Sequence, residues 1–122
     1  MGSHPINLGI RFILEIAAFI SMGAWGWYQG SGISGYLFAV GIPLLAMILW
    51  GVFNVPDDPS RSGKAPVVVL GIIRLILELV IFGTAVWMLY AVNGLVPSLI
   101  LGITVVVHYA VSYDRIAWLL KL

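Results

Sequence analysis

Two short segments of the sequence carry charges at a spacing that could do chemistry inside a membrane. One contains Arg11 and Glu15, the other contains Arg74 and Glu78, and in both the two charges are four residues apart. Residues four apart lie on one face of a helix, so each arginine can pair with its own glutamate or with a partner on another helix. We therefore predict a buried polar cluster in which these four side chains meet.

Such a cluster has two interpretations. Paired charges between helices can fix the packing of a bundle without binding anything. Alternatively, a carboxylate at membrane depth can take part in a proton or ion relay, or can anchor a polar ligand. His108 lies inside the last apolar segment and could join a relay because histidine titrates near neutral pH; the alternative is a histidine bonded to a backbone carbonyl or to headgroup water. The candidate site residues are Arg11, Glu15, Arg74, Glu78 and His108.

Other kinds of chemistry find little support in the residues. The chain has no cysteine and no histidine pair at metal-binding spacing, so we expect neither a disulfide nor a metal site. The motif Gly30-x-Gly32-x-x-Gly35 matches a dinucleotide-binding fingerprint, but it joins two apolar segments as a turn and lacks the βαβ unit which that mechanism needs. A nucleophile with a neighbouring base cannot be assembled. We therefore predict no cofactor and no enzymatic activity.

The composition indicates what surrounds these charges. Hydrophobic residues make up 61% of the 122 residues, charged residues make up 9%, and the mean hydropathy is +1.09. No charged residue occurs between Glu15 and Asp57, or between Glu78 and Asp114. A membrane-spanning helix needs about 20 mostly apolar residues, so each stretch with its flanks can hold two spans. A separate soluble catalytic domain is excluded, and the net charge of +1 argues against nucleic acid as a partner.

Turn-forming residues divide this apolar sequence. A glycine-rich stretch, a loop with three prolines and an Asn-Gly pair interrupt it. We predict a single membrane domain over residues 1–122, with four spans and one substantial loop at 54–66. The spans are expected at about 8–28, 36–53, 67–91 and 95–113. The tail from Asp114 is expected to extend the last helix or to lie along the membrane interface.

The distribution of positive charge predicts the orientation. Every lysine and arginine falls at one end of the predicted spans, namely Arg11, Arg61, Lys64, Arg74, Arg115 and Lys121. The links at the other end carry no charge. The positive-inside rule then places both termini and the 54–66 loop in the cytoplasm.

The segments around the two charge pairs also indicate an internal repeat. RFILEI at 11–16 corresponds to RLILEL at 74–79, and the differing positions exchange one large apolar residue for another. Two-helix units repeated in this way would run parallel, related by a pseudo-twofold axis along the membrane normal. The predicted fold is all-α: a polytopic membrane four-helix bundle built from two parallel two-helix repeats, with both ends on the cytoplasmic side.

Several of these motifs resemble those of a known family. They are NLGIR at 7–11, LE at 14–15, GAWGW at 23–27, WG at 50–51, and Arg74 followed by LE at 77–78. They are similar to the YrdB-like family of small bacterial four-span membrane proteins, which is classed as a domain of unknown function. The similarity extends from about residue 7 to residue 115. The resemblance implies a bacterial plasma-membrane protein of four helices, and it brings no substrate and no catalytic residue.

Two classes of function remain open. The first is a non-catalytic membrane module whose Arg/Glu cluster binds a lipid, a small ligand or a partner helix. The second is a small transporter or channel that uses the cluster, with His108, as a proton, ion or substrate site. The lipid bilayer is the expected partner in both classes, and the large lipid-facing surface of so small a bundle favours a homodimer. The residues do not indicate which small molecule or ion would be the ligand.

Overall fold

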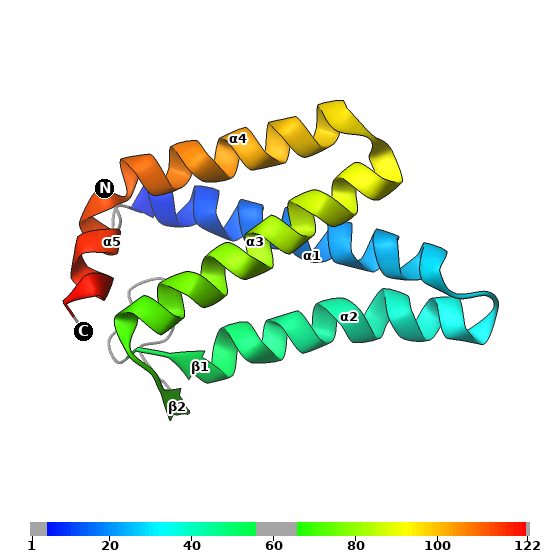
Figure 1. Cartoon of the computed structure of the whole chain (residues 1–122), viewed down its shortest axis with the longest axis horizontal. Helices are drawn as coiled ribbons and strands as arrows, with labels where there is room; N and C mark the ends of the chain where they lie inside the picture. Colours follow the sequence, from blue (N-terminus) through cyan, green and yellow to red (C-terminus); the bar gives the residue numbers. More distant parts are fainter. Residues whose placement is uncertain (1–4, 56–65, 122) are drawn as a thin grey trace.

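The computed structural model describes residues 5–55 and 66–121, which are mostly helical. In chain order the elements are α1 (Pro5–Gln29), α2 (Ile33–Val52), β1 (Phe53–Asn54), β2 (Val67–Val68), α3 (Gly71–Asn93), α4 (Leu95–Val111) and α5 (Tyr113–Leu120). Figure 1 shows both termini, α5 and the two short strands at one end of the four long helices, and the two tight turns at the other end. The predicted all-α fold is confirmed, whereas the repeat arrangement stays a prediction.

Three of the described helices are long and apolar enough to cross a membrane, namely α1, α2 and α3. α4 meets the same standard only when it is joined to α5, from which it is bent by 68°. The bend lies at Ser112, whose backbone N–H still donates to the carbonyl oxygen of His108, while its own carbonyl accepts from Arg115. Of the two predicted placements of the tail, a straight extension of the last helix is therefore wrong.

The outer surface of these helices is apolar, whereas charge lies inside. Ile13 and Ile20 are each 65% exposed, while Arg74 and Glu78 are completely buried. In water, so much exposed apolar surface would be unfavourable. In a bilayer the same distribution is the expected one, because charged side chains of membrane helices face the bundle interior. The helices are therefore compatible with a membrane protein.

The start of the third helix differs from the prediction. The span was expected from residue 67, but α3 begins at Gly71, because Val67 and Val68 form a strand that pairs in parallel with β1. The β-branched valines favour the extended conformation, and the backbone N–H of Val69 adds a hydrogen bond to Asn54 at 3.1 Å. Most of the predicted 54–66 loop, residues 56–65, lies outside the described part of the chain.

The glycine-rich motif at 30–35 forms the turn between α1 and α2. Gly32 has a φ of +59°, a conformation that residues with a side chain adopt rarely. The backbone N–H of Ser31 donates to the Ser34 hydroxyl oxygen at 3.0 Å, and that hydroxyl donates back to the Ser31 carbonyl oxygen at 2.9 Å. The motif is therefore a local turn between two helices, as expected from its neighbours.

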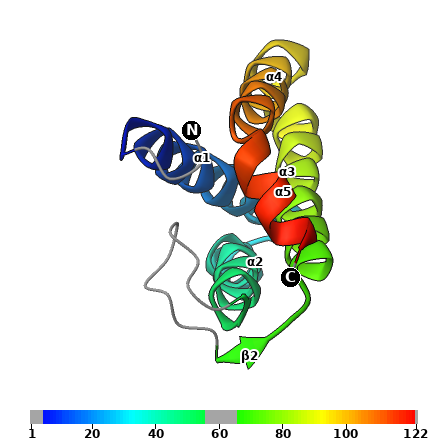
Figure 2. The same cartoon turned by 90° about the vertical axis from the view of Figure 1, so that its left-hand side faces the viewer.

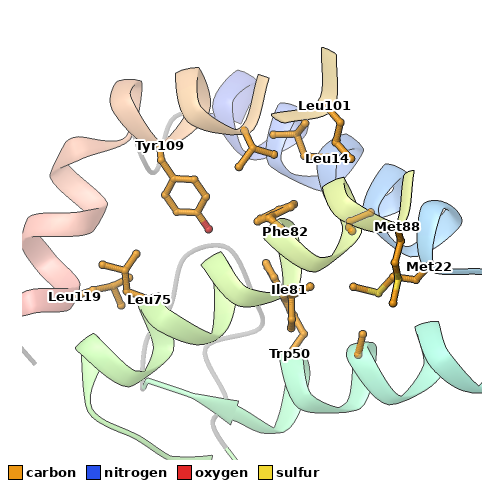
Figure 3. Close-up of a cluster of buried hydrophobic side chains, with 14 of the residues drawn as sticks. Leu14, Met22, Trp50, Leu75, Ile81, Phe82, Met88, Leu101, Tyr109 and Leu119 are labelled. Atoms are coloured by element: carbon orange, nitrogen blue, oxygen red, sulfur yellow. The ribbon is translucent and has the colours of Figure 1, made fainter. Parts of the chain in front are cut away.

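Apolar side chains from the four long helices meet in one core, shown in Figure 3. Three aromatic rings cross it. The Phe82 ring on α3 lies edge-on to Trp50 of α2, with ring centroids 5.4 Å apart, and edge-on to Tyr109 of α4 at 6.1 Å. Edge-to-face pairs at these distances are favourable because the positive ring edge meets the negative face. This aromatic row fixes α2, α3 and α4 beside the buried charges.

The contact between α3 and α5 depends on a glycine. A Cβ placed on Gly71 would collide with the carbonyl oxygen of Leu119, and Figure 2 shows α5 lying against the start of α3. We expect Gly71→Ala to displace α5 and to lower the free energy of unfolding by about 1–3 kcal/mol, the usual cost of overpacking. Thermal unfolding in detergent measures this loss.

Gly83→Ala is the matched control because it lies in the same helix with open space around its Cα. Alanine has the higher helix propensity, so the control should be neutral or slightly stabilising. Equal losses of stability in the two variants would mean that α5 does not rest on Gly71.

Candidate functional site

Glu78 lies at the centre of a group that we call the charge cluster: Arg11, Arg74, Glu78, Tyr109 and Arg115. The Glu78 side chain is completely buried. Its Oε1 lies 2.6 Å from Nη2 of Arg11 and accepts a hydrogen bond from the Tyr109 hydroxyl at 2.8 Å. Its Oε2 accepts hydrogen bonds from Nε of Arg74 at 2.8 Å and from Nη2 of Arg115 at 2.7 Å. Each carboxylate oxygen thus contacts two donor groups.

The members of the charge cluster come from four helices. α1 supplies Arg11, α3 supplies Arg74 and Glu78, α4 supplies Tyr109, and α5 supplies Arg115. Arg115 can reach Glu78 because the bend at Ser112 turns α5 back toward α3. One carboxylate therefore connects α3 to α1, α4 and α5.

Arg74 extends the charge cluster to α2. Its Nη1 donates to the carbonyl oxygens of Trp50 and Phe53, the latter at 2.8 Å. These acceptors lie at the C-terminal end of α2, where carbonyl groups lack partners within the helix and the helix dipole is negative. The Arg74 guanidinium also lies 4.9 Å from the centroid of the Trp50 ring, within the range of a cation–π interaction. Arg74 therefore joins α3 to α2.

Glu15 has different surroundings from Glu78, although the two share a sequence motif. The Arg11 Nε atom lies 3.8 Å from Glu15 Oε1, whereas Arg74 Nε lies 2.8 Å from Glu78 Oε2. Arg11 instead makes its short contact with Glu78. Glu15 is 5% exposed and lines a groove of about 340 Å³ between α1 and α2, beside Phe19 and Trp50. The two halves of the predicted repeat are thus unequal where the charges meet.

His108 is separate from these ion pairs. It is 4% exposed, and neither ring nitrogen has a hydrogen-bond partner among residues 5–55 and 66–121. The predicted alternative, a bond to a backbone carbonyl, is therefore absent from the part of the chain that the structure describes. His108 lines a second groove, between α1 and α4, together with Asn7. The structure brings the two predicted Arg/Glu pairs together and places His108 in its own groove.

Two members of the charge cluster, Tyr109 and Arg115, were not among the predicted site residues. Arg115 lies 37 residues from Glu78 in the sequence, and only the bend at Ser112 brings it back. The positive charge of Arg115 does not by itself predict a contact with Glu78. Tyr109 carries a weak signal, since a tyrosine buried in an apolar helix needs a partner for its hydroxyl.

The geometry limits what the charge cluster can do chemically. The Glu78 oxygens already contact three guanidinium groups and a hydroxyl, and neither groove described above is lined by Glu78 or by the three arginines. Among the described residues, no three His, Cys, Asp or Glu side chains are placed to hold a metal ion. Binding at Glu78 itself would require an internal contact to break first.

Together these features define a small α-helical protein with apolar, span-length helices and an ion-paired interior. The chain belongs to the family described as protein of unknown function DUF2568, whose model matches residues 9–107. It is also 44% identical over 118 residues to the uncharacterized protein YrdB of Bacillus subtilis (strain 168), an alignment that covers 97% of this chain and 96% of that one. No solved structure shows significant similarity to the present chain. The predicted YrdB-like family is confirmed.

Proposed function

We propose that this protein is a non-catalytic integral membrane module. The charge cluster is an internal clamp that holds the helices together, and ligands reach the protein from the bilayer. The observation that carries the proposal is the state of Glu78, whose two oxygens contact donors from four helices while its side chain is fully buried. A carboxylate whose oxygens already contact four donor groups contributes to helix packing and has little capacity left to bind a ligand.

The proposed orientation follows from the same charges. The described lysines and arginines lie near the start of α1 (Arg11), near the start of α3 (Arg74), in α5 (Arg115) and just after α5 (Lys121). Figure 1 shows the starts of α1 and α3 and the whole of α5 at one end of the molecule. The turns at the opposite end carry no charge. By the positive-inside rule, the end with the termini lies at the cytoplasmic face of the plasma membrane.

A second candidate function, a small proton or cation transporter, is favoured by one observation. Glu15 lines the groove between α1 and α2, and its Oε1 lies 3.8 Å from Nε of Arg11. Carboxylates inside membrane helices are costly and often mark ion or proton pathways. In this alternative Glu15, rather than Glu78, would be the residue that exchanges a proton or cation.

Flux through liposomes distinguishes the two functions. We expect wild-type protein and the Glu15→Gln variant to give the same proton and potassium flux as empty liposomes, because a clamp moves no ions. The melting temperature of each protein in detergent, measured beforehand, shows that both are folded. Flux in the wild type that disappears in Glu15→Gln would contradict the proposal of a membrane module and support the transporter.

A further inference from the structure

The groove beside His108 contains an unexplained polar group. The imidazole is 4% exposed, and its two nitrogens have no hydrogen-bond partner among the described residues. Leaving a buried donor or acceptor unpaired costs about 1–3 kcal/mol, so such groups in native proteins usually meet a ligand, an ion or water. A neutral imidazole offers one N–H donor and one acceptor nitrogen. The missing partner should therefore be able both to accept and to donate.

The shape of the groove indicates a ligand larger than water. Its volume is about 220 Å³, whereas a water molecule takes up about 30 Å³. Its lining is largely apolar, and the flanking side chains of Ile6, Ile10 and Val107 are 69%, 42% and 53% exposed on the outer surface of the helices. The groove therefore opens where the acyl chains of a bilayer would lie if the helices span it.

The polar end of the groove lies near the termini. His108 is one turn before the end of α4 at Val111, and Asn7 is in the first turn of α1. The Asn7 amide donates to the Ser112 hydroxyl at 2.7 Å, which holds it beside the bend between α4 and α5. If the helices span a bilayer, this end of the groove faces the headgroup side of the membrane rather than its centre.

The charge nearby favours an anionic partner. The described charged residues at this end of the molecule are four basic and three acidic, a net charge of +1, and Arg11 lies one helical turn from Asn7. Partly buried charges of this kind are screened less by salt than exposed ones.

We propose that the groove between α1 and α4 binds an anionic glycerophospholipid whose headgroup bears hydroxyl groups, such as phosphatidylglycerol. The His108 N–H donates to an ester or phosphate oxygen, the other ring nitrogen accepts from a headgroup hydroxyl, and the acyl chains follow Ile6, Ile10 and Val107. This inference rests on the proposed membrane module, to which it adds a ligand class. It does not depend on the clamp role of Glu78.

Native mass spectrometry of the full chain in detergent, titrated with defined lipids, tests this site. Phosphatidylglycerol should bind at least fivefold more tightly than phosphatidylcholine with the same acyl chains. His108→Phe keeps an aromatic ring and removes both nitrogens, and it should weaken phosphatidylglycerol binding about tenfold, the equivalent of about 1.4 kcal/mol. His108→Gln, which keeps a donor and an acceptor, should stay within about threefold of the wild type.

A second pair of variants tests the groove without changing the histidine. Ile10→Trp fills the groove and should abolish the preference for phosphatidylglycerol, whereas Ile103→Trp, at a residue that is 60% exposed and does not line the groove, should not. Equal binding of the two lipids by wild type, or unchanged binding by His108→Phe and Ile10→Trp, would overturn the proposal. These variants leave Glu78 intact. If a variant loses the lipid preference and keeps its melting temperature, the effect comes from the groove and not from the clamp.

Discussion

Glu78→Gln is expected to lower the free energy of unfolding by about 3–5 kcal/mol, the usual cost of removing one partner from a buried ion pair. The amide keeps the shape of the side chain but removes the negative charge that Arg11, Arg74 and Arg115 share. It also presents an NH₂ group to donors that need an acceptor. Unfolding followed by tryptophan fluorescence in detergent measures the loss.

The matched control for that experiment changes an acidic residue outside the charge cluster. Asp114→Asn removes the same charge from the exposed surface of α5, one residue from Arg115. Because Asp114 is exposed and exposed charges are screened by water, its loss should be clearly smaller than that of Glu78→Gln. A loss in Asp114→Asn as large as that in Glu78→Gln would mean that net charge, rather than the contacts of Glu78, determines stability.

Arg74→Lys should be the second most damaging change, with a loss of about 1.5–3 kcal/mol, the range for hydrogen bonds to charged groups. The Arg74 guanidinium contacts the Glu78 carboxylate and the carbonyl oxygens of Trp50 and Phe53 at the same time. Lysine keeps the charge but has a single nitrogen and lacks the planar fork that reaches both groups. Denaturant or thermal unfolding in detergent measures the difference.

The reverse exchange provides the comparison for Arg74→Lys. Lys121→Arg alters an exposed residue just after α5 and should leave stability unchanged within about 0.5 kcal/mol. If Arg74→Lys is equally harmless, a positive charge at residue 74 is sufficient, and the proposed link from α3 to the end of α2 has no energetic role.

The sequence predicts which residues are buried together more readily than how they pair. The four-residue spacing correctly indicates that each arginine and its glutamate share a helix face. It cannot indicate that the short contact of Arg11 is with Glu78, at 2.6 Å, rather than with Glu15, at 3.8 Å, because RFILEI and RLILEL are nearly the same pattern. The asymmetry depends on α5, whose position is set by contacts between residues distant in sequence.

One sequence difference does coincide with this asymmetry. The two motifs are offset by 74 − 11 = 63 residues, so Gly71 at the start of α3 corresponds to Leu8 in α1. Gly71 has no side chain, and this allows the Leu119 backbone to approach so closely. A glycine three residues before the motif was therefore the available signal for where α5 would pack. The strand at Val67–Val68 was unpredictable for a similar reason, because it depends on pairing with Phe53–Asn54.

The central claim is that the Glu78 carboxylate is the structural clamp of the interior, because its two oxygens contact donors from four helices. Thermal unfolding of wild type, Glu15→Gln and Glu78→Gln, side by side in one detergent, tests it most directly. We predict the larger loss in Glu78→Gln, because the Glu78 carboxylate is completely buried and has three short arginine contacts. Equal losses, or a larger loss in Glu15→Gln, would contradict the account.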